Sequence, residues 1–399
     1  MLFELLIALV LGILAGTITG IAPGIHVNLI SAFLIASLPS LSFIQPLVLV
    51  IFIVAMAITH TFIDFIPSIY LGAPEEDTFL AVLPGHELLK QGKGHEAVVL
   101  TLYGSLASLA IVLILIVPSI YLIPIIEKKI HLIIPFILIF ISFFMILREE
   151  RLVTSLIVFI LAGFLGFAAF NLPVKEPLLP ILTGLFGASA LITSIKTQVK
   201  LKKQKIPGLK KIKLEKNELK KSLFSSLIIA PFFSFLPALG SGYAALTSSE
   251  LFSHSRKGFL FLTGAINTIV MALSFIIIYS IGKARTGAAA AVRDILQNAS
   301  IINLTLIITA IIISGIFAFI IGVYVSKFFA KNITRINYSY ISLAVIILLF
   351  FAVSAISNLI GILIFITATS LGIFAILSGV KRIHLMGSLL IPTILYYLF

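Results

Sequence analysis

Two helix-breaking stretches hold the residues best suited to bind a ligand in this chain. The first, Gly20 to Asn28, interrupts an apolar run from Leu2 to Leu38, and the second covers Ser234 to Gly242. Prolines and glycines at these points break a helix. The helix that starts after such a break presents unpaired N–H groups and a partial positive charge, which suit a carboxylate or a phosphate. A packing kink that binds no ligand is the alternative interpretation.

Polar and conformationally special residues at the two breaks are the candidate substrate-binding groups. His26 and Asn28 fall in the first turn after the first break, where a side chain can reach a bound ion, although a lone histidine among apolar residues is often only a structural hydrogen-bond donor. Hydroxyl groups occupy the comparable turn of the second break. The candidates are Gly20, Pro23, Gly24, His26 and Asn28 in the first break, and Pro237, Gly240, Ser241, Gly242 and Thr247 in the second.

Polar residues within the apolar run Pro46 to Tyr70 are candidates for binding a coupling ion. His60 and Asp64 are four residues apart, so they share one helical face. Ionisable side chains inside a membrane span are costly and indicate function, whereas a position near the membrane boundary would leave Asp64 simply solvated. The run around Thr59 aligns with that around Asn267, which predicts two polar side chains at equivalent depth. Their oxygens, with backbone carbonyls, are ligands that a sodium ion would use.

An acidic cluster lies in the polar loop that follows. Glu75, Glu76 and Asp77 could hold a cation or relay protons, although a carboxylate cluster in a loop is usually just solvated. Two further pairs, His86-Glu87 and His95-Glu96, have none of the spacings of a zinc site such as His-Glu-x-x-His. We therefore predict no metal site in this loop.

A basic residue in the second half is the candidate partner for a substrate anion. Arg285, followed by Thr286 and Gly287, lies where a second-half loop should approach the breaks. A guanidinium group there could pair with a substrate carboxylate. Arg293 and Asp294, further along, are most simply a local ion pair.

Composition defines the class of protein. The chain has 399 residues, of which 60% are hydrophobic and 11% charged, and its mean hydropathy is +1.22. These values lie far outside the soluble globular range, and the apolar runs reach the length of membrane-spanning helices. The N-terminal run has no basic region before it and no small-residue cleavage site, so we expect it to be a retained membrane segment. There is no cysteine, which excludes disulfides and a cysteine nucleophile.

A lysine-rich segment divides the chain near its middle. It carries eleven lysines between Lys196 and Lys221 and holds most of the net charge of +13. No aromatic residue accompanies these lysines, so we expect a cytoplasmic linker that meets anionic lipid and no nucleic-acid partner. The predicted organisation is a first transmembrane repeat (1–195), a basic linker (196–221) and a second transmembrane repeat (222–399).

Each half reads as a broken pair of helices followed by about five spans. The broken pairs cover Leu2–Thr19 with Ile25–Leu38, and Leu223–Leu236 with Ala244–Phe252. Five further crossings per half would place the two halves in opposite orientations, which is an inverted-topology repeat. The fold class is therefore an all-α polytopic membrane protein, and the sequence leaves open whether the pairs are re-entrant or fully spanning. The five spans are Pro46–Tyr70, Ala97–Val117, Ile130–Leu147, Leu152–Phe170 and Leu178–Ile195 in the first half, and Gly258–Ile281, Ile301–Ser326, Ile336–Ala355, Leu359–Val380 and Ile383–Phe399 in the second.

Loop charges predict which ends of the helices share a side of the membrane. With the linker inside, the stretch 283–294 falls outside, where its basic residues would be unusual, so we expect it to dip inward. The loops expected inside contain residues 72–96, 148–151, 256–257, 327–335 and 381–382, and those expected outside contain 127–129, 175–176 and 283–294.

Several motifs resemble one transporter family. The pattern Gly20-x-x-Pro23-Gly24, the loop Leu71 to Gly94 with Pro74 and Gly85, and the stretch Phe235 to Gly240 are similar to signatures of the large permease subunit (TctA) of the tripartite tricarboxylate transporter family. This sequence departs from the family pattern where Glu75 and Ala238 replace glycines and where Pro84 replaces an aspartate. The resemblance implies a small organic anion as substrate and, as partners, a small membrane subunit and an extracytoplasmic binding protein.

The functional expectation is a secondary transporter in the plasma membrane. It would move a di- or tricarboxylate by alternating access and use sodium or protons, since the chain has no ATP-binding P-loop. An alternative of the same class is translocation of an anionic carrier lipid such as a polyprenyl phosphate. An intramembrane enzyme using His26, His60 and Asp64 is the alternative of a different class, but the chain has none of the nucleophile motifs or metal-binding patterns expected of one. A structural scaffold is another alternative. We expect no enzyme activity and no cofactor beyond the coupling ion, and an oligomer remains open.

Overall fold

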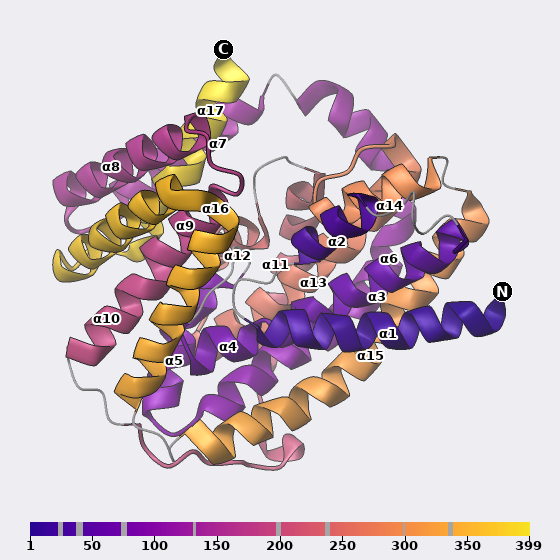
Figure 1. Cartoon of the computed structure of the whole chain (residues 1–399), viewed down its shortest axis with the longest axis horizontal. Helices are drawn as coiled ribbons and strands as arrows, with labels where there is room; N and C mark the ends of the chain where they lie inside the picture. Colours follow the sequence, from indigo (N-terminus) through magenta and orange to yellow (C-terminus); the bar gives the residue numbers. More distant parts are fainter. Residues whose placement is uncertain are drawn as a thin grey trace.

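The protein is a bundle of helices, seen in the computed structural model shown in Figure 1. The structure describes residues 1–22, 27–36, 43–72, 78–130, 133–196, 201–235, 240–297, 300–333 and 338–399, and these contain no strand. Before the linker lie α1 (Leu2–Ile21), α2 (Val27–Ala36), α3 (Pro46–Ile63), α4 (Phe65–Tyr70), α5 (Phe79–Lys90), α6 (Gly94–Ile130), α7 (Ile134–Leu147), α8 (Leu152–Asn171), α9 (Leu178–Leu182), the π-helix η2 (Thr183–Ala188) and α10 (Ser189–Lys196). The rest of the chain forms η3 (Leu209–Lys211), α11 (Lys216–Phe235), α12 (Ser241–Phe252), α13 (Arg256–Ile281), α14 (Gly287–Leu296), α15 (Ile301–Asn332), α16 (Tyr338–Leu377), η5 (Arg382–Met386) and α17 (Gly387–Leu398).

Seven of the described helices are long and apolar enough to cross a membrane, which confirms a multi-pass helical membrane protein. Two predicted spans, Ile130–Leu147 and Leu178–Ile195, correspond to shorter apolar helices, Ile134–Leu147 and Leu178–Thr193. The predicted span Ile383–Phe399 corresponds to a helix of the same length, Arg382–Leu398. A helix of 14 residues such as α7 extends about 21 Å, less than the roughly 30 Å of a bilayer core. The stretch 72–96, which was expected to be a loop, also differs, because its central part forms α5.

The two predicted spans at 336–380 meet at a sharp break within α16. Asn358 has φ +62° and ψ −172°, so the helix stops and starts again there. Its amide Nδ2 donates to the carbonyl of Pro173 at 2.9 Å, and its Oδ1 accepts from the backbone N–H of Ile360 at 3.0 Å. The side chain therefore caps the second segment and ties the break to the loop after α8.

Helix packing sorts the described residues into two bundles, each built from both sides of the linker. The first, which we call the core bundle, contains α1 to α6 and α11 to α15. The second, the outer bundle, contains α7 to α10 and α16 to α17, and it lies on the left and top of Figure 1. All extensive packing between described helices falls inside one bundle or the other. The pairing is reciprocal, since α6 packs along α13 while α15, its counterpart in chain order, packs along α3.

Backbone-to-backbone contacts hold the core bundle together. A Cβ atom added to Gly104 of α6 would lie 1.9 Å from the carbonyl oxygen of Phe261, and one added to Gly264 of α13 would lie 2.1 Å from that of Thr101. The two helices therefore cross at a distance that only glycine permits. Ser105 reinforces the crossing, because its hydroxyl donates to the Gly264 carbonyl at 3.0 Å. Close approach through small residues is how membrane helices gain packing energy.

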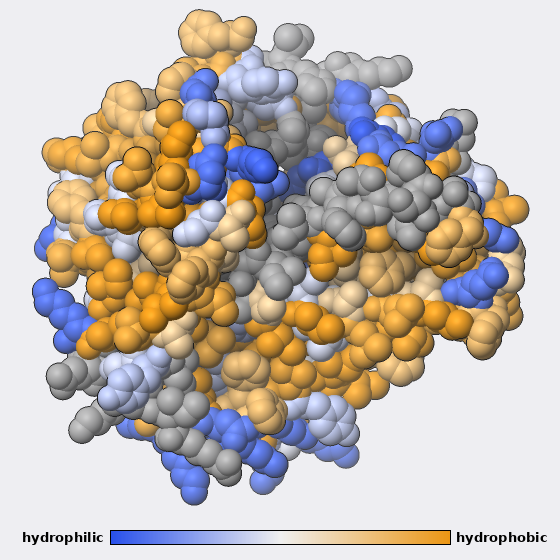
Figure 2. Space-filling model, viewed as in Figure 1, coloured by the Kyte–Doolittle hydropathy of each residue, from blue (hydrophilic) through white to orange (hydrophobic). Residues whose placement is uncertain are grey.

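The linker is bound to the core bundle through its main chain and one buried side chain. Gln204 accepts a hydrogen bond from the N–H of Gly94 at 2.9 Å and donates to the Leu89 carbonyl at 3.0 Å. The N–H of Lys205 also donates to the Gly92 carbonyl at 2.8 Å. Hydrophilic residues gather along the lower edge of the face in Figure 2, where Figure 1 shows the linker, while apolar side chains cover much of the rest.

Ion pairs of the described residues join loops that the charge pattern assigns to one side of the membrane. On the linker side, Arg256 pairs with Glu87 at 2.9 Å and Lys257 pairs with Glu96 at 2.6 Å. On the opposite side Lys283 pairs with Glu127. The stretch expected to dip inward forms α14, which packs on α2 and α3 rather than lying as a plain loop. Which side is the cytoplasm stays a prediction.

Candidate substrate and ion site

The candidate site is built around an interruption between α3 and α4. Asp64 is the single residue between the two helices, and it is buried. Pro67 has no N–H to donate to the carbonyl of Ile63 one turn earlier, so the helix cannot continue regularly through this point. The interruption places the Asp64 carboxylate close to a backbone carbonyl, that of Ile63, that lacks its regular helical hydrogen bond, inside a candidate membrane span.

A chain of three buried side chains joins the halves of the protein at this point. The Asn267 amide of α13 donates to Oδ2 of Asp64 at 2.9 Å, and the Ser241 hydroxyl donates to Oδ1 of Asn267 at 3.1 Å. Ser241 is the first residue of α12, and Gly240 caps that helix in an extended conformation. The start of the second broken helix is therefore linked to the predicted coupling residues of α3 and α13.

His60 connects the same region to the end of α1. Its Nδ1 lies 3.0 Å from the hydroxyl oxygen of Thr19, two residues before α1 ends at Ile21. Gly20 is a packing position, because a Cβ atom there would lie 2.7 Å from Cβ of Ile63. The end of α1 is thus fixed against α3 immediately before the first break.

Hydroxyl groups that we did not single out from the sequence surround these residues. The Thr61 and Thr268 hydroxyl oxygens lie 3.1 Å apart, and those of Ser68 and Thr78 lie 2.6 Å apart. All four side chains are buried. The sequence offered one indication of their role, because Thr61 directly follows His60 and Thr268 directly follows Asn267. We did not select them because a serine or threonine hydroxyl in a membrane helix usually bonds to the backbone of its own helix.

Other predicted residues do not join this cluster. Thr59 is buried with no hydrogen-bond partner for its hydroxyl among the described residues, and it packs against Gly16 of α1. Asn267 instead approaches the carbonyl of Thr61 at 3.5 Å. Gly242 is buried in the first turn of α12, and Thr247 lies one turn further on, partly exposed.

The second-half loop reaches the end of α11. The Arg285 guanidinium donates to the carbonyl of Phe233, two residues before α11 ends at Phe235. Thr286 caps α14 by accepting the Ala289 N–H at 3.1 Å, and Gly287 begins that helix. The loop therefore lies beside the end of α11, where the second predicted break begins.

Several predicted residues lie outside the described residues. They are Pro23, Gly24 and His26 of the first break, Glu75, Glu76 and Asp77 of the acidic loop, and Pro237 of the second break. Asn28 falls within α2, which begins at Val27. The described ends of the broken helices agree with the predicted breaks, since α1 ends at Ile21 and α11 at Phe235.

The chemistry of the cluster is that of oxygen ligands. A carboxylate, an amide oxygen and several hydroxyls meet in a buried region, which is the donor set for a proton or a hard cation such as sodium. Among the described residues, no group of three or more His, Cys, Asp or Glu side chains could hold a metal ion.

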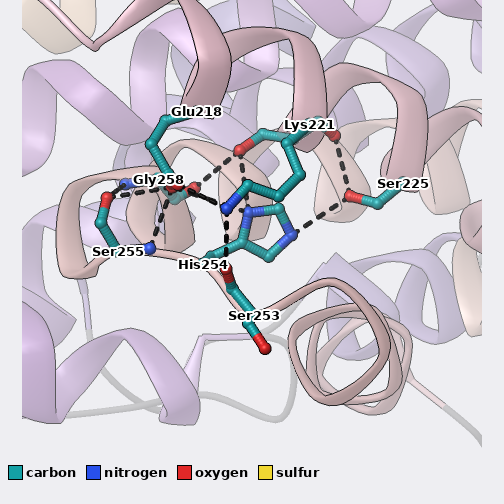
Figure 3. A network of polar contacts seen from close by, with 8 residues as sticks. Glu218, Lys221, Ser225, Ser253, His254, Ser255 and Gly258 are labelled. Atoms are coloured by element: carbon teal, nitrogen blue, oxygen red, sulfur yellow. Dashed lines mark hydrogen bonds and ion pairs between the residues drawn. The ribbon is translucent and has the colours of Figure 1, made fainter.

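A separate polar network fixes the far end of α12 (Figure 3). Glu218 of α11 accepts from the backbone N–H of Ser255 at 2.9 Å and from its hydroxyl at 3.0 Å, and it forms an ion pair with Lys221. The Lys221 ammonium in turn donates to the carbonyl of Ser253 at 2.8 Å. These contacts attach the turn between α12 and α13 to α11.

His254 lies at the centre of the network with its ring buried. Its Nδ1 and Nε2 each lie 3.3 Å from a serine hydroxyl, those of Ser222 and Ser225, and its Nδ1 lies 3.9 Å from Oε2 of Glu218. Burial lowers the pKa of His254 below its usual value; the Glu218 carboxylate acts in the opposite direction, and the Lys221 ammonium adds to the lowering.

This environment predicts acid sensitivity of the corner between α12 and α13. The folded state favours neutral His254, so its contribution to stability is present above the unfolded pKa of about 6.5 and is lost as the pH falls below it. Between pH 7.5 and 5.5 the unfolding temperature should fall more for the wild type than for His254→Gln, which cannot titrate. Thermal unfolding of both proteins in detergent across this range measures the difference. Identical pH dependence would contradict the prediction.

Comparison with known proteins adds a family. The model of the tripartite tricarboxylate transporter TctA family matches residues 6–387. The chain is also 34% identical over 413 aligned positions to a protein of Methanocaldococcus jannaschii that carries the name uncharacterized protein MJ1079, covering 98% of this chain and 99% of that protein. No solved structure matches the chain.

Proposed function

The chain belongs to the tripartite tricarboxylate transporter TctA family, and on this premise we propose that it is a secondary transporter that couples uptake of a di- or tricarboxylate to the movement of an ion. Membership itself implies a transporter of the plasma membrane, in keeping with the seven apolar helices of spanning length among the described residues. We further propose that transport is coupled to an ion and that specific residues bind this ion and the substrate.

One observation carries the proposal, namely the buried chain from Asp64 through Asn267 to Ser241. Burying a carboxylate such as that of Asp64 in a membrane span is energetically unfavourable, so its presence there indicates a functional role. Here it is linked to the first residue of a helix that starts at a break, where N–H groups favour an anion. Ion and substrate sites that share a hydrogen-bonded chain can influence each other's affinity, as coupled transport requires.

We assign the coupling ion to the oxygen ligands around Asp64 and the substrate to the starts of the broken helices. Arg285 supports the second assignment, because it lies beside the second break and could pair with a substrate carboxylate. The reciprocal packing of α6 on α13 and α15 on α3 supports two structurally equivalent, inverted halves. We also propose that the linker lies in the cytoplasm, and that a small membrane subunit and an extracytoplasmic binding protein are partners, as the family name implies.

Uptake into proteoliposomes tests this function. Purified protein is reconstituted, a panel of radiolabelled mono-, di- and tricarboxylates is added, and sodium and proton gradients are imposed in turn. We expect accumulation of one carboxylate class under one of the two gradients and none in liposomes without protein.

Two results would contradict the proposal. Uptake that depends on neither the sodium nor the proton gradient would exclude ion coupling and indicate a passive carrier. Binding or flipping of a labelled polyprenyl phosphate, with no carboxylate uptake, would favour the carrier-lipid alternative.

A further inference from the structure

We propose that transport moves the core bundle against the outer bundle as two rigid bodies, and that the ion pair between Arg148 and Glu250 holds them in the arrangement shown here. The inference rests on the proposed transport function and adds the identity of the moving parts. It differs from a movement of one sequence half against the other, because each bundle contains helices from both halves.

Each bundle is rigid for the same physical reason. In the core bundle α6 and α13 touch through Gly104 and Gly264. In the outer bundle a Cβ atom on Gly166 would lie 1.8 Å from the carbonyl of Ser388, and one on Gly387 would lie 2.1 Å from that of Phe159. Backbones in direct contact cannot slide without breaking the packing, so neither bundle is expected to deform internally during transport.

Packing of helix along helix is much weaker between the bundles, although one buried apolar cluster includes residues of both, such as Phe62 of α3 and Phe159 of α8. No described helix of one packs extensively along a described helix of the other. Leu71, after α4, contributes apolar contact to the cluster around Leu191 of α10. Arg148, in the turn after α7, donates through its Nη1 to Oε2 of Glu250 on α12 at 2.8 Å and to the Glu250 carbonyl at 3.2 Å. Both side chains reach solvent, with 50% of Arg148 and 26% of Glu250 exposed, and exposed ion pairs break readily.

Helix α12, which carries Glu250 of the ion pair, is hydrogen-bonded to the core bundle near both of its ends. Glu250 lies three residues before the turn that the network of Figure 3 ties to α11. α12 begins at Ser241, which is bonded to Asn267 of the candidate site. One short helix thus has the bundle contact near one end and the candidate site at the other. The site residues Asp64, Asn267 and Ser241 all belong to the core bundle, so they would travel together.

Cross-linking can test this directly, because the chain has no cysteine. We would make Arg148→Cys/Glu250→Cys and join the thiols with a cleavable bifunctional thiosulfonate long enough to replace an arginine–glutamate pair. The matched control is Glu96→Cys/Lys257→Cys, which replaces an ion pair of 2.6 Å inside the core bundle. We expect cross-linking to lower carboxylate uptake at least tenfold in the first variant, with recovery after reduction, and to leave uptake within twofold in the control.

Full uptake by the cross-linked Arg148→Cys/Glu250→Cys protein would overturn the inference. So would an equal loss in the control, because the block would then not depend on movement between bundles.

A distance measurement separates this inference from the function itself. Spin labels at the exposed positions Leu14 of α1 and Leu363 of α16 report between the bundles, and labels at Leu14 and Tyr324 of α15 report within the core bundle. We expect the first distance to change or split between sodium-containing, sodium-free, neutral and acidic conditions, while the second stays single. An unchanging first distance overturns the inference even if uptake is measured. A changing one supports it even if no carboxylate on the panel proves to be a substrate.

Discussion

Replacing Asp64 with asparagine is expected to lower ion-driven uptake by about 100-fold or more, equivalent to about 2.7 kcal/mol of lost coupling. Asparagine has nearly the same shape and still accepts a hydrogen bond from Asn267, whose amide lies 2.9 Å from the Asp64 carboxylate. It cannot carry the negative charge or a titrating proton. The loss should therefore affect coupling while the protein remains folded. Initial rates of uptake in proteoliposomes under the effective gradient measure it.

The matched control for this substitution is Asp294→Asn. Asp294 is 42% exposed and pairs with its neighbour Arg293, so the same chemical change removes a solvated charge. We expect uptake by this variant within twofold of the wild type. If Asp64→Asn transported as well as Asp294→Asn at equal reconstitution, Asp64 would have no part in coupling. Unfolding temperatures of both variants show whether folding has been disturbed.

Placing valine at Gly104 is the substitution with the largest expected effect on stability. The added Cβ would overlap the carbonyl of Phe261 at 1.9 Å, and a backbone oxygen cannot turn aside as a side chain can. The variant must separate α6 from α13, which we expect to cost about 3 kcal/mol or more. The unfolding temperature in detergent should fall by about 5 °C or more, with less monodisperse protein recovered.

Gly208→Val provides the comparison. Gly208 lies in the linker, and a Cβ atom there would have nothing within 4 Å. Its backbone, with φ −61° and ψ 149°, suits any residue. Equal unfolding temperatures for Gly104→Val and Gly208→Val would show that the crossing of α6 and α13 tolerates wider spacing.

The parts of the site that could be predicted from the sequence are those with a strong local signal. A buried charge such as Asp64 stands out in an apolar run, and proline and glycine mark the helix ends near Ile21 and Phe235. The hydrogen bond between Asn267 and Asp64 could not be predicted from such a local signal. It depends on how α3 packs beside α13, and helical periodicity reports only which face of a helix is apolar.

The π-helix η2 could not be predicted from the sequence, because it is stabilised by a residue far away in the chain. The predicted span at 178–195 contains the π-helix η2, where the wider turn frees backbone carbonyls. The Arg382 guanidinium donates to two of them, those of Leu185 and Phe186. Local sequence around 183–188 shows two glycines but gives no sign of an arginine that follows some two hundred residues later.

Interleaved bundles impose an order on biosynthesis. As the ribosome delivers the chain into the membrane, α3 and α6 emerge long before their partners α15 and α13, which follow the linker. The glycine face at Gly104 is therefore without its partner α13 during that interval. Contacts between such distant segments form late and slowly. Synthesis must pass α15 before the core bundle can close, and a pause or truncation before that point would leave an open set of helices for the membrane proteases to recognise.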